Sequence, residues 1–284
     1  MNKSLAPTRC GNTEFRWGER TYIMGVCNLS PDSFTGDGLG SDMAALVAQA
    51  RRFVDEGADI IDIGGESTRP GMEPLSIDDV DRELELVIPA IERLVNEVPV
   101  PLSIDTYKSA VARRAVKAGA SMINDIWGLK RDPGIAEVAA EAGVPLILMG
   151  NQRDAPVRLG IVSRVIAELE RSIELATEAG VPGENIIIDP GIGFGKSQEQ
   201  NLELVNRLAE LKSLGKPILL GPSRKSVIGQ VLDLPPDQRV EGTAATLAIG
   251  IANGADIVRV HDVKEMVRVC RMSDAIIRRG LIVD

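Results

Sequence analysis

The sequence lacks the features of membrane, secreted and nucleic-acid-binding proteins. No stretch approaches the roughly 18 uninterrupted apolar residues of a membrane span, and the opening MNKSLAPTRCGN has no apolar signal core. The three cysteines, Cys10, Cys27 and Cys270, are far apart and form no C-x-x-C pair. We therefore expect a reduced, cytoplasmic protein. A net charge of −9 argues against non-specific nucleic-acid binding, although a local site for a small anion remains open.

Short apolar runs of strand length recur along the 284 residues. They are rich in Ile, Val and Leu, as expected of parallel strands that are buried on both faces. The predicted strands are residues 21–26, 59–64, 100–105, 121–125, 144–150, 185–189, 216–221 and 256–260.

Helical patterns separate these runs. In the first, Leu46, Ala50 and Phe53 follow the spacing of one apolar helix face. A phrase such as DEGAD, with Gly57 as a helix stop, recurs before several strands. Eight such units predict a (β/α)8 TIM barrel, a fold that typically takes about 250 residues, and an open doubly wound sheet is the alternative. We expect residues 1–20 to be an N-terminal extension that caps the barrel floor and residues 21–284 to be a single barrel domain.

The only histidine of the chain, His261, follows the last predicted strand. Side chains alternate along a strand, so Arg259 and His261 share one face while Val258 and Val260 point to the other. The apolar valine side chains would pack against the surrounding helices. We therefore expect the polar pair to point into the barrel mouth.

Other predicted strands also end in polar residues, among them Asp105, Asn124 and Asp189. Each has a simpler interpretation alone, since Asp105 could cap the next helix and Asp189 could belong to a turn. TIM-barrel active sites lie at the carboxyl ends of the strands. Because unpaired buried charges are costly, polar residues at six strand ends indicate either an internal ion-pair network or a ligand site, and we favour the ligand site.

Three loops on this face stand out. Residues 28–40 and 64–74 are long and rich in Gly, Pro and Ser, as lids and binding loops are. PGIGFGKS, residues 190–197, nearly matches the phosphate-loop pattern, but Pro190 occupies the place of its first glycine. We interpret it as a loop that allows close backbone approach to a flat ring, with Phe194 alongside.

Seven motifs, NLSPDSF, GGESTRPG, SIDTYK, IND, DPGIGFGK, GPSRKS and RVHD, occur in an order typical of one family, over roughly residues 21 to 280. The chain resembles the dihydropteroate synthases of the pterin-binding TIM-barrel superfamily. The resemblance implies an enzyme that joins p-aminobenzoate to 6-hydroxymethyl-7,8-dihydropterin diphosphate, releasing diphosphate, in folate synthesis. It also implies a homodimer.

The resemblance assigns roles to the residues of the mouth. Asp189 would accept two hydrogen bonds from the pterin amino group and ring N–H, a task that suits a carboxylate. Asp105 would stabilise the pterin-methyl cation that remains when diphosphate departs. The implied catalytic residues are Asp105, Lys225, Arg259 and His261.

The implied substrate site is larger and draws on most loops of the mouth. It comprises Asn28, Phe34, Thr68, Arg69, Pro70, Asp105, Asn124, Met149, Asp189, Phe194, Gly221, Lys225, Ser226, Arg259, Val260 and His261. The diphosphate would be bound by Asn28, Thr68, Arg69, Arg259, His261 and the Val260 backbone. The p-aminobenzoate pocket would use Phe34, Pro70 and Ser226. Mg²⁺ is the implied cofactor, with Asn28 as its protein ligand.

Three positions depart from the family pattern. Gly150 and Gln200 stand where many members have histidine, and Trp127 replaces a small residue. Two alternatives therefore stay open: a pterin-binding paralogue without synthase activity, and a methyltetrahydrofolate:corrinoid methyltransferase of the same superfamily. The intact STRPG and SRKS motifs argue against the first. The second needs no diphosphate site, so the implied arginines and histidine discriminate against it.

Overall fold

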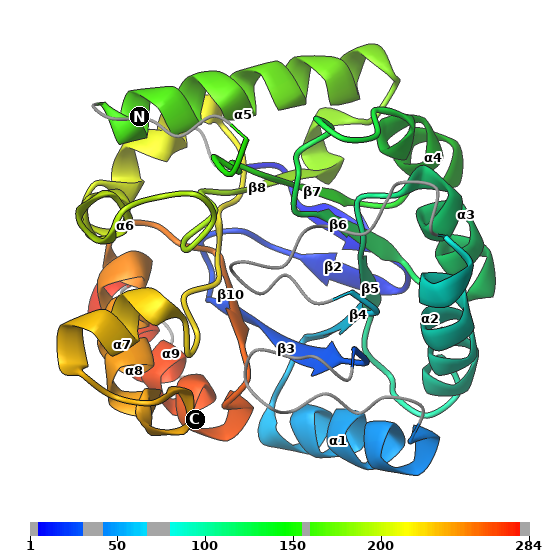
Figure 1. Cartoon of the computed structure of the whole chain (residues 1–284), viewed down its shortest axis with the longest axis horizontal. Coiled ribbons are helices and arrows are strands. Elements are labelled where there is room, and N and C mark those ends of the chain that lie inside the picture. The colour runs from blue at the N-terminus through cyan, green and yellow to red at the C-terminus, as the bar shows by residue number, and fades with distance from the viewer. Residues whose placement is uncertain (1–4, 31–41, 67–79, 155–159, 279–284) are drawn as a thin grey trace.

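The structure, a computed structural model, describes residues 5–30, 42–66, 80–154 and 160–278. Eight parallel strands form its central sheet. They are β3 (Tyr22–Asn28), β4 (Ile60–Gly64), β5 (Leu102–Asp105), β6 (Met122–Asp125), β7 (Leu146–Met149), β8 (Ile186–Asp189), β9 (Leu219–Leu220) and β10 (Ile257–Val260). Their order is β8-β7-β6-β5-β4-β3-β10-β9, and a parallel bridge between Ile188 and Ile218 joins the two ends (Figure 1). The predicted (β/α)8 barrel is confirmed.

Helices surround the barrel (Figure 1). They are α1 (Met43–Glu56), α2 (Asp81–Leu94), α3 (Ser109–Ala118), α4 (Gly134–Ala142), α5 (Ile161–Glu178), α6 (Gln198–Asn206), α7 (Ser226–Leu232), α8 (Val240–Ala252) and α9 (Val263–Ile277). None of the helices in the described part of the chain combines the length and apolar character that crossing a membrane requires.

The first helix shows how local sequence determines these elements. Asp42 caps α1 by accepting a hydrogen bond from the backbone N–H of Ala45 at 2.9 Å. The helix ends at Gly57, whose φ of 106° is unfavourable for residues with a side chain. The predicted apolar face is buried, and Phe53 packs so closely against β3 that a Cβ at Gly25 would lie 2.7 Å from its ring.

Residues alternate between the barrel interior and the helix layer along each strand. In β10, Val258 and Val260 belong to the apolar cluster shared with the helices, whereas Ile257 belongs to the interior cluster. Ile61 and Ile63 of β4 likewise face the helices. The predicted orientation of the valines is therefore confirmed.

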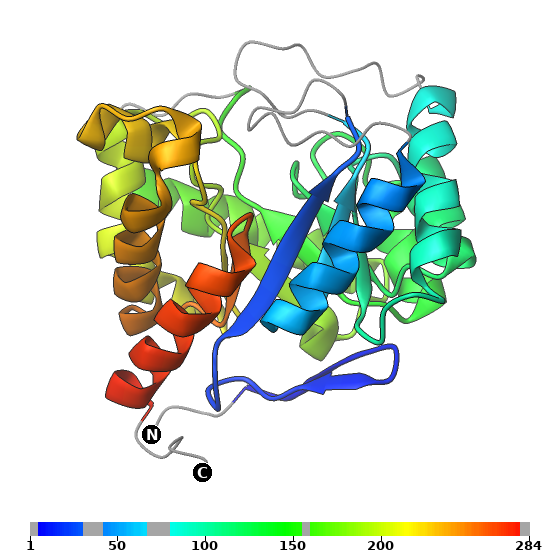
Figure 2. The same cartoon turned by 90° about the horizontal axis from the view of Figure 1, so that it is seen from below.

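The segment before the barrel forms a two-stranded hairpin, β1 (Thr8–Cys10) and β2 (Thr13–Phe15), across one end of the barrel (Figure 2). Trp17 follows it, and its indole N–H donates to the Thr8 hydroxyl at 3.0 Å. The hairpin and the lower interior side chains form one apolar cluster, which we call the apolar floor. It consists of Cys10, Phe15, Trp17, Tyr22, Met24, Ile60, Met122, Ile147, Ile187, Leu219 and Ile257. Among the described residues, apolar side chains therefore fill this end of the barrel.

Candidate active site

Polar side chains occupy the barrel interior above the apolar floor. The strand register aligns Asn28 with Gly64, Gly64 with Asp105, and Asp105 with Asn124. Residues paired in this way face the same side of a sheet. The structure thus brings together three side chains that the sequence predicted separately.

Arg259 crosses the barrel to reach two carboxylates. Its Nε donates to Asp62 at 2.6 Å and a terminal nitrogen donates to Asp105 at 2.8 Å. Asn124 donates to the same Asp62 oxygen at 3.2 Å. The prediction that Arg259 points into the mouth is confirmed. We call the polar set of Asp62, Asp105, Asn124, Asp189, Lys225, Arg259 and His261 the charged mouth.

Asp62 is a further residue of the mouth, which the sequence indicates by its position although it was not predicted. It lies two residues before Gly64 on β4 and therefore faces the interior by the same alternation that places Asp105 there. Its side chain is fully buried, and its Oδ1 accepts no hydrogen bond within the described residues. A carboxylate there requires a cation nearby, and Arg259 supplies it.

Burial shifts the ionisation of this cluster. Burial raises the pKa of Asp105 to about 7, while the Arg259 charge acts in the opposite direction. Burial also works to lower the pKa of Arg259, but Asp62 and Asp105 together raise it above its usual value. The guanidinium therefore remains charged, whereas burial favours the neutral form of Asp105 more than Arg259 opposes it.

Asp189 and Lys225 form the second charged group of the mouth. An Asp189 oxygen accepts from the Gly191 backbone N–H at 2.6 Å, so the suspected turn exists, but it does not exclude a binding role. Burial raises the pKa of Asp189, and the Lys225 charge opposes that shift. Burial lowers the pKa of Lys225 to about 8, and Asp189 counteracts it. The Lys225 ammonium donates to the Ile192 carbonyl at 2.7 Å.

Apolar side chains line one side of this pair. Met149 and Phe194 belong to one buried cluster with Tyr107, Ile126 and Trp127. Trp127, which departs from the family pattern, therefore adds an aromatic ring to this cluster. The centroids of the Trp127 and Tyr107 rings are 6.4 Å apart in an edge-to-face arrangement. This side of the mouth suits a flat, partly apolar ligand.

Two cations approach the face of Phe194. The Lys225 Nζ and the guanidinium carbon of Arg153 each lie 4.6 Å from its ring centroid. Cation–π contacts of this kind orient a ring and hold charge beside an apolar surface. Arg153 was not predicted from the sequence, because no motif includes it.

His261 lies at the end of β10, where its Nδ1 is 3.0 Å from the Ser223 hydroxyl. The same hydroxyl accepts the His261 backbone N–H at 3.2 Å. Gly221 lies beside the stem of Arg259, since a Cβ there would be in ordinary contact with the Arg259 Cβ, at 3.5 Å. The side chain of Val260 faces the helices, so only its backbone can serve the mouth.

The remaining predicted residues divide into two groups. Ser226 begins α7 and lines a groove together with Arg153 and Gln198. Phe34, Thr68, Arg69 and Pro70 lie outside the described residues, so their predicted roles stay predictions. Asn28 ends β3, and the position of its amide oxygen is defined by the distances to its neighbours. A Cβ at Gly64 would lie 3.9 Å from its amide oxygen and 3.8 Å from an Asp105 oxygen, so these two oxygen donors face the same space.

The glycine-rich loop packs closely against another segment of the chain, and its predicted approach to a flat ring stays a prediction. A Cβ at Gly191 would lie 2.0 Å from the Gly150 carbonyl oxygen, and one at Gly195 would lie 2.3 Å from Gln152 backbone atoms. These glycines therefore allow close approach of the segment after β7. Gly193 alone faces the site, where a Cβ would lie 3.2 Å from Lys225.

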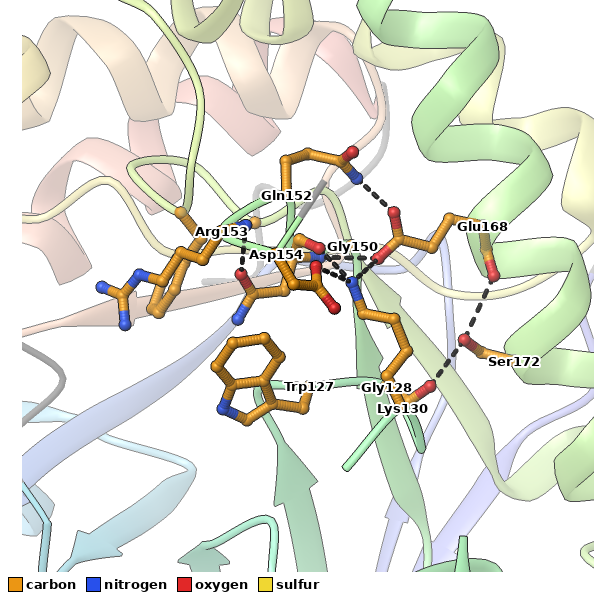
Figure 3. Close-up of polar contacts among 12 residues, drawn as sticks. Trp127, Gly128, Lys130, Gly150, Gln152, Arg153, Asp154, Glu168 and Ser172 are labelled. Atoms are coloured by element: carbon orange, nitrogen blue, oxygen red, sulfur yellow. Dashed lines mark hydrogen bonds and ion pairs between the residues drawn. The ribbon is translucent and has the colours of Figure 1, made fainter. Parts of the chain in front are cut away.

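The segment after β7, residues 150–154, is held by side chains from other elements (Figure 3). Glu168 of α5 accepts from the Asn151 backbone N–H at 2.9 Å and from Lys130 at 2.8 Å, and it also accepts from the Gln152 side chain. Lys130 in turn donates to the Asn151 carbonyl and to Asp154. This cluster fixes the backbone that carries Arg153 to Phe194.

The third departure lies away from the mouth. Gln200 completes a capping box with Ser197 at the start of α6, a role that glutamine performs well. Asp125, which follows Asn124, also turns away and accepts from the Trp127 and Leu129 backbone N–H groups.

Comparison with known proteins agrees with this arrangement. The family model described as pterin binding enzyme matches residues 24–261. A dihydropteroate synthase from Clostridium beijerinckii is 51% identical over 272 residues, which cover 95% of this chain and 100% of that protein.

Two solved structures share the fold. A dihydropteroate synthase from Clostridium difficile, in the presence of pteroic acid, has a TM-score of 0.88 and 49% identity, covering 93% of this chain and 100% of that one. One from Xanthomonas albilineans with 4-aminobenzoic acid has a TM-score of 0.87 and 41% identity, covering 96% and 98%. The similarities extend over the strands and loops that build the charged mouth.

Proposed function

The chain belongs to the family of pterin-binding enzymes and, within it, to the dihydropteroate synthases, and from this premise we propose how its residues divide the reaction. The enzyme condenses 6-hydroxymethyl-7,8-dihydropterin diphosphate with p-aminobenzoate, giving 7,8-dihydropteroate and diphosphate. The observation that carries the residue assignments is the charged mouth. It places buried carboxylates and buried cations at one end of a closed barrel.

The pterin ring is bound by Asp189, Lys225 and Asn124. Asp189 has one oxygen engaged by the Gly191 N–H, which leaves acceptor capacity for the amino group and ring N–H of the pterin. Lys225 donates to the ring carbonyl side. Met149 and Phe194 line the ring, which replaces water with apolar and aromatic contacts.

Asp105 stabilises the cation formed on the pterin methylene as the carbon–oxygen bond to diphosphate breaks. Its partner Arg259 fixes the carboxylate in place, and the Arg259 charge favours the ionised form of Asp105 against the effect of burial. The nitrogen of p-aminobenzoate then attacks the methylene carbon and loses a proton. Preorganised charge at the reacting carbon is the main contribution of the protein. An aromatic amine that attacks such a cation needs no strong general base.

His261, Arg259 and the Val260 backbone bind the departing diphosphate, together with Arg69 and Thr68 of the second long loop. Ser223 orients the His261 ring through its hydroxyl. Ser226, at the first turn of α7, and the predicted Phe34 and Pro70 shape the p-aminobenzoate pocket. The two substrates thus meet above Asp105.

Mg²⁺ is the proposed cofactor. The described residues contain no group of three His, Cys, Asp or Glu side chains that could hold a metal ion. Asn28 offers a hard amide oxygen that faces the same space as Asp105, which suits a magnesium ion bound mainly by diphosphate oxygens and water. When bound, the ion would neutralise charge on the leaving group.

We also propose that the enzyme is a cytoplasmic homodimer. Its cysteines are all free and buried, as a reducing compartment allows. Leu202, Val231, Leu232 and Ile249 are exposed along one apolar groove between α6, α7 and α8. A second copy would cover this face. Sedimentation of Ile249→Glu should give a monomer where the unmodified chain gives a dimer.

Purified enzyme with both substrates and Mg²⁺ tests the assignment. Diphosphate should be released only when p-aminobenzoate is present. Asp189→Ala should abolish pterin binding, and Arg259→Ala should weaken binding of the diphosphate ester far more than binding of free pterin. Tight pterin binding without release would identify a paralogue instead. Equal losses for both ligands in Arg259→Ala would contradict the assigned diphosphate site.

A further inference from the structure

Lys196 is a buried cation that none of the roles above uses. It lies near the end of the glycine-rich loop, directly before Ser197, the N-cap of α6. Its ammonium donates to three backbone carbonyls: Gly150 at 2.7 Å, Gly191 at 2.8 Å and Phe194 at 3.2 Å. It therefore joins the end of β7 to two points of the loop that begins at Asp189.

The three acceptors determine which form of the side chain fits. A lysine ammonium has three donors, whereas the neutral amine has only two. Loss of the proton leaves one buried carbonyl without its donor, and an unmade buried hydrogen bond is costly. The loop geometry seen here is that of the protonated form.

The carbonyls that Lys196 holds belong to functional segments. Gly191 supplies the N–H that orients Asp189, and Phe194 supplies the ring that the Arg153 and Lys225 charges approach. Gly150 also donates its N–H to the Asp189 carbonyl at 2.9 Å. A shift of Lys196 would therefore displace both the carboxylate and the ring.

We propose that Lys196 is a positioning residue for pterin recognition, which acts by holding Asp189 and Phe194 through these three carbonyls. The inference rests on the proposed pterin role of Asp189. Lys196 touches neither substrate in this account. It differs from Lys225, which donates to the ring itself.

The charges that surround Lys196 give the proposal a pH signature. Burial lowers its pKa to about 7, against the pull of Asp189 on β8 and Glu168 on α5. Lys225, before α7, and Lys130, after β6, lower it further by repulsion. Lys196 thus loses its proton near neutral pH, before Lys225, whose pKa burial lowers to about 8. Pterin affinity should begin to fall as the pH rises through about 7.

The experiment measures binding of 6-hydroxymethylpterin from pH 5.5 to 9.5 in four purified full-length proteins. These are the unmodified chain, Lys196→Met, Lys196→Arg and the control Lys216→Met. Lys216 is a matched control because its ammonium also donates to a backbone carbonyl, that of Gly183 at 2.7 Å, but outside the charged mouth. Thermal unfolding confirms that each variant is folded.

The expected results differ between the variants. Lys196→Met should bind pterin about tenfold more weakly or worse at pH 6.5, the size expected for a lost charged hydrogen bond, and should lose the decline near pH 7. Lys196→Arg keeps its charge, so its affinity should decline about one pH unit higher, where Lys225 titrates. Lys216→Met should match the unmodified chain.

Two outcomes would overturn the proposal. The first is a Lys196→Met affinity within twofold of the unmodified chain, with the decline near pH 7 retained. The second outcome is decisive if Lys196→Met does not fold. In that case, a Lys196→Arg affinity that declines at the same pH as that of the unmodified chain would overturn the proposal. Asp189→Asn, measured in parallel, separates the two levels of the account. If Asp189→Asn binds pterin normally, the proposed pterin site is wrong, whereas a loss confined to Asp189→Asn overturns only the role of Lys196.

Discussion

The apolar floor and the charged mouth are built on the same strands, two residues apart. Ile187 of β8 lies in the floor and Asp189 faces the mouth, and Ile257 and Arg259 of β10 repeat the arrangement. Both members of each pair point inward because side chains alternate along a strand. The fold therefore decides the direction of a side chain and which end of the barrel is available for a site, and the residue type decides which inward-facing positions can bind and react.

The two regions also differ in their effect on stability. Apolar burial in the floor stabilises the fold by roughly 25 cal/mol for each Å². In the mouth, burial raises the pKa of Asp105 and Asp189 and lowers that of Lys225, so the fold disfavours the charged form of all three. The floor stabilises a barrel whose other end is prepared for a ligand at some expense in stability.

The largest effect on stability should come from the floor. Ile187→Ala should lower the free energy of unfolding by about 2–5 kcal/mol, because it leaves a cavity among fully buried side chains. Chemical denaturation measures the loss. The activity of the folded fraction should remain normal at low temperature. An equal loss of kcat in fully folded protein would show that the floor also shapes the site.

The matching substitution in the mouth is Asp105→Asn. It should reduce kcat by about 10²- to 10³-fold, as removal of a preorganised charge does elsewhere, and it should not lower stability at neutral pH by more than about 1 kcal/mol. Steady-state kinetics and denaturation on the same preparation check both numbers. A large loss of stability with unchanged kcat would reverse the comparison.

The pH dependence of stability sharpens the contrast further. Burial raises the folded-state pKa of Asp105 from 3.8 to about 7, so between these values the native state binds more protons than the unfolded chain. Stability conferred by this site should therefore fall as the pH rises through this range, because the unfolded chain gives up the proton of Asp105 before the folded chain does. Urea denaturation of the unmodified chain and Asp105→Asn across this range isolates the effect. Parallel curves would contradict it.

The smallest effect is expected from a residue in neither region. Asp42→Ala removes the N-cap of α1 and should lower stability by about 1 kcal/mol without changing kcat or KM. Thermal unfolding and kinetics test this. If kcat falls, the helix layer contributes to the chemistry, and the division into floor and mouth is too simple.

Much of the barrel was predictable because alternation and the recurring helix–glycine–strand pattern are local signals. These signals are enough to predict that Arg259, Asp105 and Asn124 lie at one end of the barrel. Asp62 could have been found by the same rule, since it precedes Gly64 by two residues on an inward-facing register.

Other parts of the site could not be predicted in this way. Lys196 and Glu168 act through backbone groups of distant segments, and no spacing in the sequence reports such contacts. The close approach of Gly191 and Gly195 to the segment after β7 was likewise not predicted from the sequence. Contacts of this kind depend on how loops pack together, which local patterns do not encode.

The measurement that tests the account most directly compares two ligands in two variants. Calorimetry would give the affinities of 6-hydroxymethylpterin and of its diphosphate ester for His261→Gln and Asp189→Asn. We expect His261→Gln to weaken only the diphosphate ester, whereas Asp189→Asn should weaken both ligands by the same factor. If His261→Gln weakened both ligands equally, or neither, the two ends of the charged mouth would not have separate tasks.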